Sequence, residues 1–237
     1  MPMIEWCVIP AIIPQSLTHL RENVARLGGE KARSAFSPRE IQIDIVDGMF
    51  VSNKSWPYKE TDPTSHIGML ADVLPDGMSY ELDLMIANPL ATLPVWLATH
   101  PRQIVLHIES FATDEDVMCA ITMTHAARVG VILAALNDTP LERLFVFVPY
   151  LDGIQCMGIA EIGRQGNTFD ARVLARIREL REKYSTLSIN VDGSVNTETI
   201  PLLKVAGANR FVVGSGIFAT DDPVGAYEEL YKLVSMA

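Results

Sequence analysis

Apolar and polar residues alternate strictly over residues 41–46, and the rest of the chain is organised around this short stretch. Three isoleucines there alternate with Gln42, Asp44 and Val46. A period of two residues predicts a β-strand, and its isoleucine face is suited to pack beneath covering helices. The opposite face carries an amide and a carboxylate, which a buried interior does not accept without a compensating reason. The pattern therefore predicts a strand with one structural face and one chemically active face.

Seven other strand-like runs occur along the chain, and they alternate with helical segments. The expected strands are Trp6–Ile9 (ended by Pro10), Ile41–Val46, Ser79–Ile86, Gln103–Glu109, Gly130–Leu133, Ile154–Ile159, Leu187–Val191 and Arg210–Val213. The expected helices are Ser16–Leu27, one opened by Asp62-Pro63, Pro89–Ala98 (short or kinked at Pro94), Asp114–Arg128, one from Thr139-Pro140 to near Tyr150, Phe169–Tyr184, Glu198–Val205 and one opened by Asp221-Asp222-Pro223. Eight such units without a linker favour one closed parallel barrel over a doubly wound sheet. The sequence thus predicts an α/β protein, a single (β/α)8 TIM barrel spanning residues 1–237.

Composition narrows the class of partner. The chain is 49% hydrophobic and 20% charged, and its formal net charge is −10. This acidic balance argues against nucleic acid and anionic membranes, but a local site can still bind a phosphorylated substrate. No apolar run approaches the ~18 residues that would span a bilayer, and no signal-peptide pattern precedes the first strand, so we expect a cytoplasmic protein. The three cysteines lack metal-site spacing, which predicts buried free thiols.

Polar residues gather at the expected carboxyl ends of the strands, where an α/β barrel carries its chemistry. The inward groups predicted there are Gln42, Asp44, Glu81, Asp83, His107, Glu109, Asn190 and Asp192, and Met85, His107 and Met157 are expected to line a substrate pocket. Several carboxylates in one low-dielectric mouth cannot all stay ionised without a cation. The cluster therefore predicts a bound metal, or raised pKa values suited to proton transfer. The alternative is a solvated rim held by hydrogen bonds to amides and backbone.

Two glycine-containing turns follow the last two strands. Asp192-Gly193-Ser194 follows the seventh, and Gly214-Ser215-Gly216 follows the eighth. Small residues expose backbone N–H groups, and barrels of this class often bind phosphate at these two positions. The loop after strand six, which contains Arg164, could close a third side. The predicted phosphate-binding residues are Gly166, Gly193, Ser194, Gly214 and Ser215; ordinary tight turns are the alternative.

These motifs resemble the ribulose-phosphate 3-epimerase family. Gln42–Asn53 reads Gln-Ile-Asp-Ile-Val-Asp-Gly-Met-Phe-Val-Ser-Asn, and the family signature reads His-Ile-Asp-Val-Met-Asp-Gly-His-Phe-Val-Pro-Asn. The resemblance continues in order through Glu81–Pro89, Val191-Asp192-Gly193 and Val213–Phe218. It extends from about residue 6 to residue 235.

The resemblance implies an isomerase that interconverts phosphoketose epimers of the D-ribulose 5-phosphate and D-xylulose 5-phosphate type by proton exchange at carbon 3. Asp44 and Asp192 correspond to the family's acid and base. Its two metal-binding histidines correspond to Gln42 and Asp83, so the implied metal set, Gln42, Asp44, Asp83 and Asp192, offers only oxygen ligands. Such ligands favour Mg²⁺ or Mn²⁺ over Zn²⁺. The site could also work without metal, with one carboxyl group holding a proton. Because relatives commonly assemble, we expect a homo-oligomer.

Two other functions remain open. The first is a different sugar-phosphate isomerase, aldolase or decarboxylase on the same barrel. An aldolase or decarboxylase often needs a lysine, and Lys54, in the loop after strand two, is the nearest candidate. The second is a non-catalytic binder of a phosphorylated ligand. In the same loop, Trp56 is expected either to lie over the mouth as a lid or to cover apolar surface.

Overall fold

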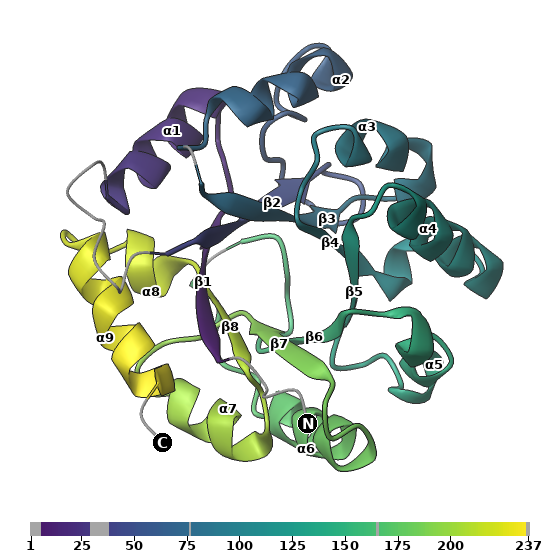
Figure 1. Cartoon of the computed structure of the whole chain (residues 1–237), viewed down its shortest axis with the longest axis vertical. Helices are drawn as coiled ribbons and strands as arrows, with labels where there is room; N and C mark the ends of the chain where they lie inside the picture. The colour runs from purple at the N-terminus through teal and green to yellow at the C-terminus, as the bar shows by residue number, and fades with distance from the viewer. Residues whose placement is uncertain (1–5, 29–37, 76, 165, 236–237) are drawn as a thin grey trace.

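A closed barrel of eight parallel strands forms the centre of the molecule, and the helices surround it (Figure 1). The structure is a computed structural model that describes residues 6–28, 38–75, 77–164 and 166–235 of the 237. The strands pair in sequence order, and β8 closes the barrel against β1. The predicted (β/α)8 TIM barrel is therefore confirmed.

All eight expected strands are present, most with bounds shifted by one or two residues. They are β1 (Cys7–Ile12), β2 (Glu40–Val46), β3 (Ser79–Met85), β4 (Gln103–His107), β5 (Gly130–Ala135), β6 (Gly153–Met157), β7 (Ser188–Asp192) and β8 (Arg210–Val213). The expectation that Pro10 ends β1 was wrong. Cys7–Pro10 pairs with β8, and pairing with β2 begins at Ala11. Pro10 thus lies where one partner strand takes over from the other, a position that tolerates a missing N–H.

The helices are shorter and more interrupted than the sequence pattern suggests. They are α1 (Leu17–Arg26), α2 (Pro63–His66), η2 (Ile67–Asp72), η3 (Pro89–Ala91), α3 (Leu93–Leu97), η4 (Ile108–Ser110), α4 (Asp114–Ala126), α5 (Glu142–Phe145), η5 (Val148–Tyr150), α6 (Arg172–Lys183), α7 (Ile200–Ala206), α8 (Ser215–Phe218) and α9 (Pro223–Ser235). Pro94 lies near the start of α3, so the expected break is confirmed. A helix accommodates proline without a break only in its first turn, because proline has no N–H to donate to the preceding turn. The unexpected α8 begins directly after β8.

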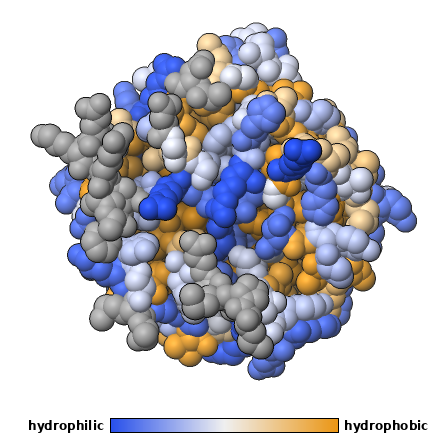
Figure 2. Space-filling model, viewed as in Figure 1, coloured by the Kyte–Doolittle hydropathy of each residue, from blue (hydrophilic) through white to orange (hydrophobic). Residues whose placement is uncertain are grey.

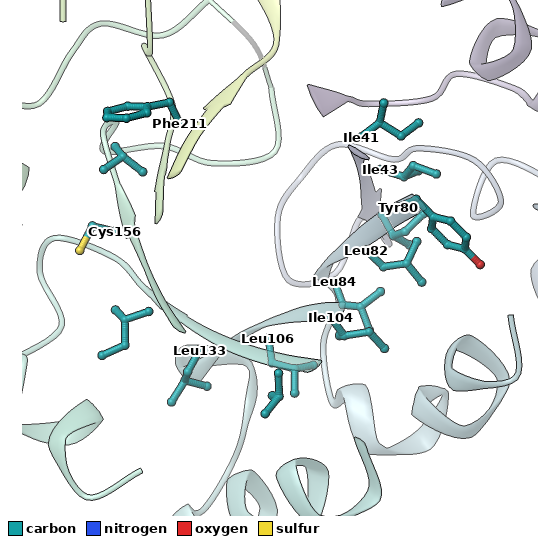
Figure 3. Close-up of a cluster of buried hydrophobic side chains, with 14 of the residues drawn as sticks. Ile41, Ile43, Tyr80, Leu82, Leu84, Ile104, Leu106, Leu133, Cys156 and Phe211 are labelled. Carbon is teal, nitrogen blue, oxygen red and sulfur yellow. The ribbon is translucent and has the colours of Figure 1, made fainter. Parts of the chain in front are cut away.

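The outward face of the strands forms the main hydrophobic core. Figure 3 shows the labelled side chains of β2 to β5 projecting from the strands toward the surrounding helices. Ile43 and Leu82, which are neighbours in the ladder, are both fully buried. Trp56 also belongs to this core and is only 1% exposed, so it covers apolar surface and is not a lid. The isoleucine face of β2 is therefore the structural face, as its pattern predicts.

The surface is mostly hydrophilic on one face, and the cysteines differ in their burial. Hydrophilic residues lie over the centre of the face seen in Figure 2, with smaller apolar areas between them. In the described part of the chain, no helix is both long enough and apolar enough to cross a bilayer. The three cysteines are free thiols, but only Cys156 is fully buried. Cys119 is exposed on α4, so its predicted burial was wrong.

Candidate active site at the mouth of the barrel

Three aspartates from three strands meet inside the barrel at its C-terminal end. Asp44 pairs in register with Asp83 on the neighbouring strand, and Asp192 is the last residue of β7. Their carboxylate oxygens lie within 4.8 Å of one another. The sequence predicted this cluster because each aspartate has the inward parity of its strand. The register then brings all three to the same level of the barrel.

Gln42 connects the two predicted catalytic aspartates. Its side-chain Nε2 donates to Asp44 Oδ1 at 2.8 Å and to Asp192 Oδ2 at 3.0 Å. Gln42 itself is fully buried one layer below the mouth. A single amide group thus holds the carboxyl groups of β2 and β7, which are separated by β8 and β1, in a fixed relation.

Asp83 has a different set of partners. His107 Nε2, at the end of β4, lies 3.0 Å from Asp83 Oδ1, and Gln155 Nε2 donates to Asp83 Oδ2 at 2.9 Å. The ring of Phe50 covers His107 at a centroid distance of 5.5 Å. Gln155 was not predicted from the sequence. It is the one amide side chain in the otherwise apolar β6, which is a weak signal by itself.

Burial and mutual repulsion shift the acidity of this cluster. Burial, followed by the charges of Asp192 and Asp83, raises the pKa of Asp44 well above its ordinary value. Burial and the Asp83 charge raise the pKa of Asp192 to about 7. Burial alone would lower the pKa of His107, but the adjacent Asp83 carboxylate outweighs it, so the net shift is upward. Asp44 and Asp192 therefore hold protons at higher pH than ordinary aspartates do.

The same donor set fits a hard divalent cation. Three carboxylates converge, and the Gln42 Oε1 atom is buried with no hydrogen-bond partner among the described groups. Rotation of the Gln42 amide would turn this oxygen toward Asp44 and Asp192 in place of Nε2. Carboxylate and amide oxygens suit Mg²⁺ or Mn²⁺, whereas Zn²⁺ prefers nitrogen and sulfur ligands.

Besides Gln42, two more residues expected at the mouth lie below it. Glu81 precedes Asp83 by two residues, which is one layer toward the N-terminal end. There it accepts a hydrogen bond from Arg210 Nη2 at 2.6 Å and another from Gln103 Nε2. Asn190 lies in the same register as Arg210. The prediction that both side chains point into the barrel is correct. The alternation along a strand, however, does not tell at which level along the barrel axis a side chain lies.

Glu109 was also placed wrongly. It follows β4 in the 3₁₀ turn η4, and its Oε1 atom accepts hydrogen bonds from the Leu136 N–H at 2.8 Å and from Thr139. This carboxylate anchors the loop after β5. It does not join the aspartate cluster, because the inward alternation ends with the strand at His107.

The predicted phosphate turns border the aspartates. The cavity at the mouth measures about 50 Å³. Its lining includes Asp44, Asp192, Met85 and Met157 together with Gly166, Gly193, Ser194, Gly214 and Ser215. The turn after β7 requires glycine: Gly193 has φ +96°, and a Cβ there would lie 2.5 Å from Ile159 Cγ1. His107 lies outside this lining and contacts the site through Asp83.

Two loops meet at Gly163, in the wall of this cavity. Asn53, in the loop after β2, donates from Nδ2 to the Gly163 carbonyl in the loop after β6 at 3.1 Å. Val51 packs so closely against Gly163 that a Cβ there would lie 2.6 Å from Val51 Cγ2. Lys54 does not reach the cavity at the mouth; it lines a neighbouring one. The position of Lys54 thus gives no support to a lysine-dependent aldolase or decarboxylase.

The fold and this site define a (β/α)8-barrel enzyme with clustered acid–base groups at its C-terminal mouth. Residues 7–218 match the model of the ribulose-phosphate 3-epimerase family, and the chain belongs to that family. Its curated relatives are isomerases. The ribulose-phosphate 3-epimerase of Eremothecium gossypii is 29% identical over 77% of this chain and 76% of its own length. That of Mycobacterium bovis is 26% identical over 97% of this chain and 93% of its own length.

Solved structures support the same architecture. A crystal structure of 3-hexulose-6-phosphate synthase superposes with a TM-score of 0.68 at 20% identity. The match covers 96% of this chain and 99% of that protein. At this level of identity the likeness concerns the fold, and function must be argued from the site.

Proposed function

We propose that this chain interconverts D-ribulose 5-phosphate and D-xylulose 5-phosphate by proton exchange at carbon 3. One observation carries the proposal: Asp44 and Asp192 approach the mouth from two sides, share the Gln42 amide, and both have raised pKa values. A proton-transfer catalyst works best when its pKa lies near the working pH. Two such groups facing one cavity can act as an acid and a base in the same reaction.

The exchange needs one ionised and one protonated carboxyl group. The ionised carboxylate takes the proton from carbon 3, and the electron pair of the broken C–H bond moves toward the carbon 2 carbonyl, which becomes an enediolate. The protonated carboxyl group then donates to carbon 3 from the opposite face. Because repulsion between Asp44 and Asp192 disfavours two charges, the pair shares one proton in the resting state. In the reverse direction the two groups exchange roles.

The remaining residues position the substrate. The two turns after β7 and β8, which line the cavity, would hold the phosphate through their backbone N–H groups, and α8, which begins at Ser215, would add further N–H donors. Met85 and Met157 provide apolar walls beside the aspartates. Holding the phosphate fixes carbon 3 between the two carboxyl groups, which lowers the entropic part of the barrier.

A divalent cation is the proposed cofactor, with Mg²⁺ or Mn²⁺ favoured over Zn²⁺. Asp44, Asp83, Asp192 and Gln42 would hold it. Its positive charge would stabilise the negative charge that develops on the enediolate oxygens. In its absence Asp83 keeps His107 as its cationic partner, and the Gln42 amide remains the donor toward the other two aspartates. A cytoplasmic location and a homo-oligomeric state stay predictions from the sequence.

A coupled assay of D-ribulose 5-phosphate conversion tests the proposal, with Mg²⁺, Mn²⁺ and Zn²⁺ each supplied in turn. We expect turnover that is highest with Mg²⁺ or Mn²⁺ and is lost in Asp44→Asn and Asp192→Asn. Asp152→Asn is a matched control, because Asp152 only accepts a backbone N–H at the start of β5. No turnover with any metal, together with ligand binding that survives both substitutions, would instead indicate a non-catalytic phosphate binder.

A further inference from the structure

A second and larger cavity adjoins the mouth. It measures about 500 Å³, ten times the volume of the cavity over the aspartates, and lies within the size range of small-molecule sites. The two cavities share Ala11, Ile13, Gly163 and Arg164 in their walls. The second cavity lies on the side of the barrel where α1 and α8 flank β1 (Figure 1). Neither the aspartates nor the two phosphate turns line it.

The walls of this cavity are basic, although the chain as a whole carries a net charge of −10. Its ionisable lining residues are His19, Arg26, Lys54, Lys59 and Arg164. The other polar residues among the described lining are amides, and the described lining contains no carboxylate. A concave surface of one sign focuses the electrostatic field and attracts ligands of the opposite sign.

Local contacts hold the two lysines in place. The backbone of Lys54 forms an isolated antiparallel bridge with Asp47, and its aliphatic stem lies on Gly48. A Cβ on Gly48 would lie 2.7 Å from Lys54 Cγ, so glycine makes this contact possible. Lys59 donates to the Gln15 side chain across the cavity. Neither lysine forms an ion pair with a carboxylate in the described part of the chain.

The α1 side of the cavity is also organised. Arg26 donates to the carbonyls of Phe218 at 3.0 Å and Thr220 at 2.7 Å, which ties α1 to α8. His19 Nδ1 accepts a hydrogen bond from the Gln15 N–H at 3.2 Å, and His19 Nε2 lies 3.0 Å from Asn23 Nδ2. Like the two lysines, Arg26 has no carboxylate partner among the described residues. Three cations without an anion, held around one cavity, are arranged for a multiply charged ligand.

We propose that this basic cavity binds a second phosphate-class anion beside the mouth, separate from the phosphate that the turns after β7 and β8 would hold. The shared wall at Ile13 and Gly163 gives the bound anion two possible sources. It is either the second phosphate of a bisphosphorylated ketose whose first phosphate lies at the turns, or a free polyphosphate anion. In both cases Lys54 and Lys59 supply the charge.

Calorimetric titration of the full chain distinguishes these sources. In the first arm, inorganic pyrophosphate is titrated into the chain alone and into the chain saturated with D-ribulose 5-phosphate. In the second arm, D-ribulose 1,5-bisphosphate is compared with D-ribulose 5-phosphate. A free-anion site gives pyrophosphate binding that survives saturation. A site for a second phosphate gives bisphosphate affinity about tenfold above that of the monophosphate.

The double substitution Lys54→Met/Lys59→Met tests the assignment of the site. It should weaken the binding seen in either arm by at least about tenfold and leave D-ribulose 5-phosphate affinity unchanged. Arg128→Met/Arg178→Met is the matched control. Arg128 follows the end of α4, Arg178 lies on α6, and both are exposed; removing them makes the same change in net charge. That control should keep both affinities within about twofold of the starting protein, since distant exposed charges are screened.

Two results would overturn the inference: no binding in either arm, or binding that the double lysine substitution leaves intact. The bisphosphate arm rests on the proposed function, but the pyrophosphate arm without substrate does not. Failure of epimerase turnover with lysine-dependent pyrophosphate binding would refute only the proposed function. Normal turnover with neither ligand bound would refute only this inference.

Discussion

The two ends of the barrel interior both bury carboxylates, but they neutralise them differently. At the N-terminal end, Glu40 and Glu81 lie beside Arg210, and Arg102 reaches Glu40 from the rim. At the mouth, three aspartates lie within 4.8 Å of one another, and His107 is the one basic side chain bonded to them among the described residues. Amide groups of Gln42 and Gln155 supply the other contacts.

The two sets of carboxyl groups therefore have different roles in the molecule. Arginine keeps its charge in proteins, so a carboxylate paired with it serves as a permanent structural link. An amide donates a hydrogen bond without supplying charge, and the Asp44 and Asp192 carboxyl groups beside it keep raised pKa values. Burial raises the pKa of Glu81 as well, but the Arg210 guanidinium opposes that shift, whereas the mouth has no arginine among the described residues to oppose it at Asp44 and Asp192.

Asp44→Asn should have the largest effect of all. An amide of the same shape cannot accept a proton from carbon 3, so we expect kcat to fall by about 10³-fold. Thermal unfolding should show no loss of stability, because the substitution removes a poorly solvated carboxyl group. A loss of activity that merely follows a loss of folded protein would contradict a catalytic role.

Arg210→Met tests the opposite end of the barrel. Removing this guanidinium leaves Glu81 buried without its cation, and we expect denaturant unfolding to show a loss of about 3 kcal/mol. Activity per folded molecule should stay within about twofold, because Arg210 lies below the site.

Arg210→Met/Glu81→Gln is the matching control for that experiment. Removing the stranded charge should recover part of the lost stability. If the single substitution abolished turnover without lowering stability, the division of the barrel into a structural and a chemical layer would be wrong.

Metal binding should stabilise the mouth and leave the lower layer unaffected. Mg²⁺ or Mn²⁺ at about 100 times its dissociation constant should raise the free energy of unfolding by about 2.7 kcal/mol. Asp83→Asn should remove most of this gain, whereas Asp114→Asn, on the exposed start of α4, should not. Equal stabilisation of all three proteins would place the cation elsewhere.

The smallest expected effect is a pH dependence of stability in the metal-free chain. The folded pKa of Asp192 is raised from 3.8 to about 7, so between these values the folded chain holds a proton that the unfolded chain has released. The contribution of Asp192 to the free energy of unfolding is thus largest at the low-pH end of this window and is lost as the pH rises toward 7. Lowering the pH from about 7 to 5.5 should add about 2 kcal/mol.

Asp192→Asn should make this dependence shallower, because the asparagine does not titrate, whereas Asp44, whose pKa is also raised, still does. Denaturant unfolding of both proteins over the same pH series, with a chelator present, provides the measurement. An equally steep dependence in the variant would assign the proton to another group.

The sequence predicted the fold well because hydrophobic periodicity sets both the strands and their parity. It also placed Asp44, Asp83 and Asp192 on one face, since each occupies an inward position of its strand. It could not place Glu81, because height along the axis depends on how the strands are staggered. Gln155 was overlooked since one amide in an apolar strand carries little signal until its partner, Asp83, is known. The lining of the basic cavity comes from α1, α8 and two loops that are far apart in the sequence, so no local sequence pattern predicts it.

The contact between Asn53 and Gly163 has a kinetic consequence. With the loops joined, the space above the aspartates is about 50 Å³, room for only a few water molecules and below the size range of small-molecule sites. We therefore expect substrate capture and product release to require these loops to part. The association rate would then fall below the encounter limit and respond to solvent viscosity and to substitutions at Val51, far more than to the acidity of the carboxyl groups.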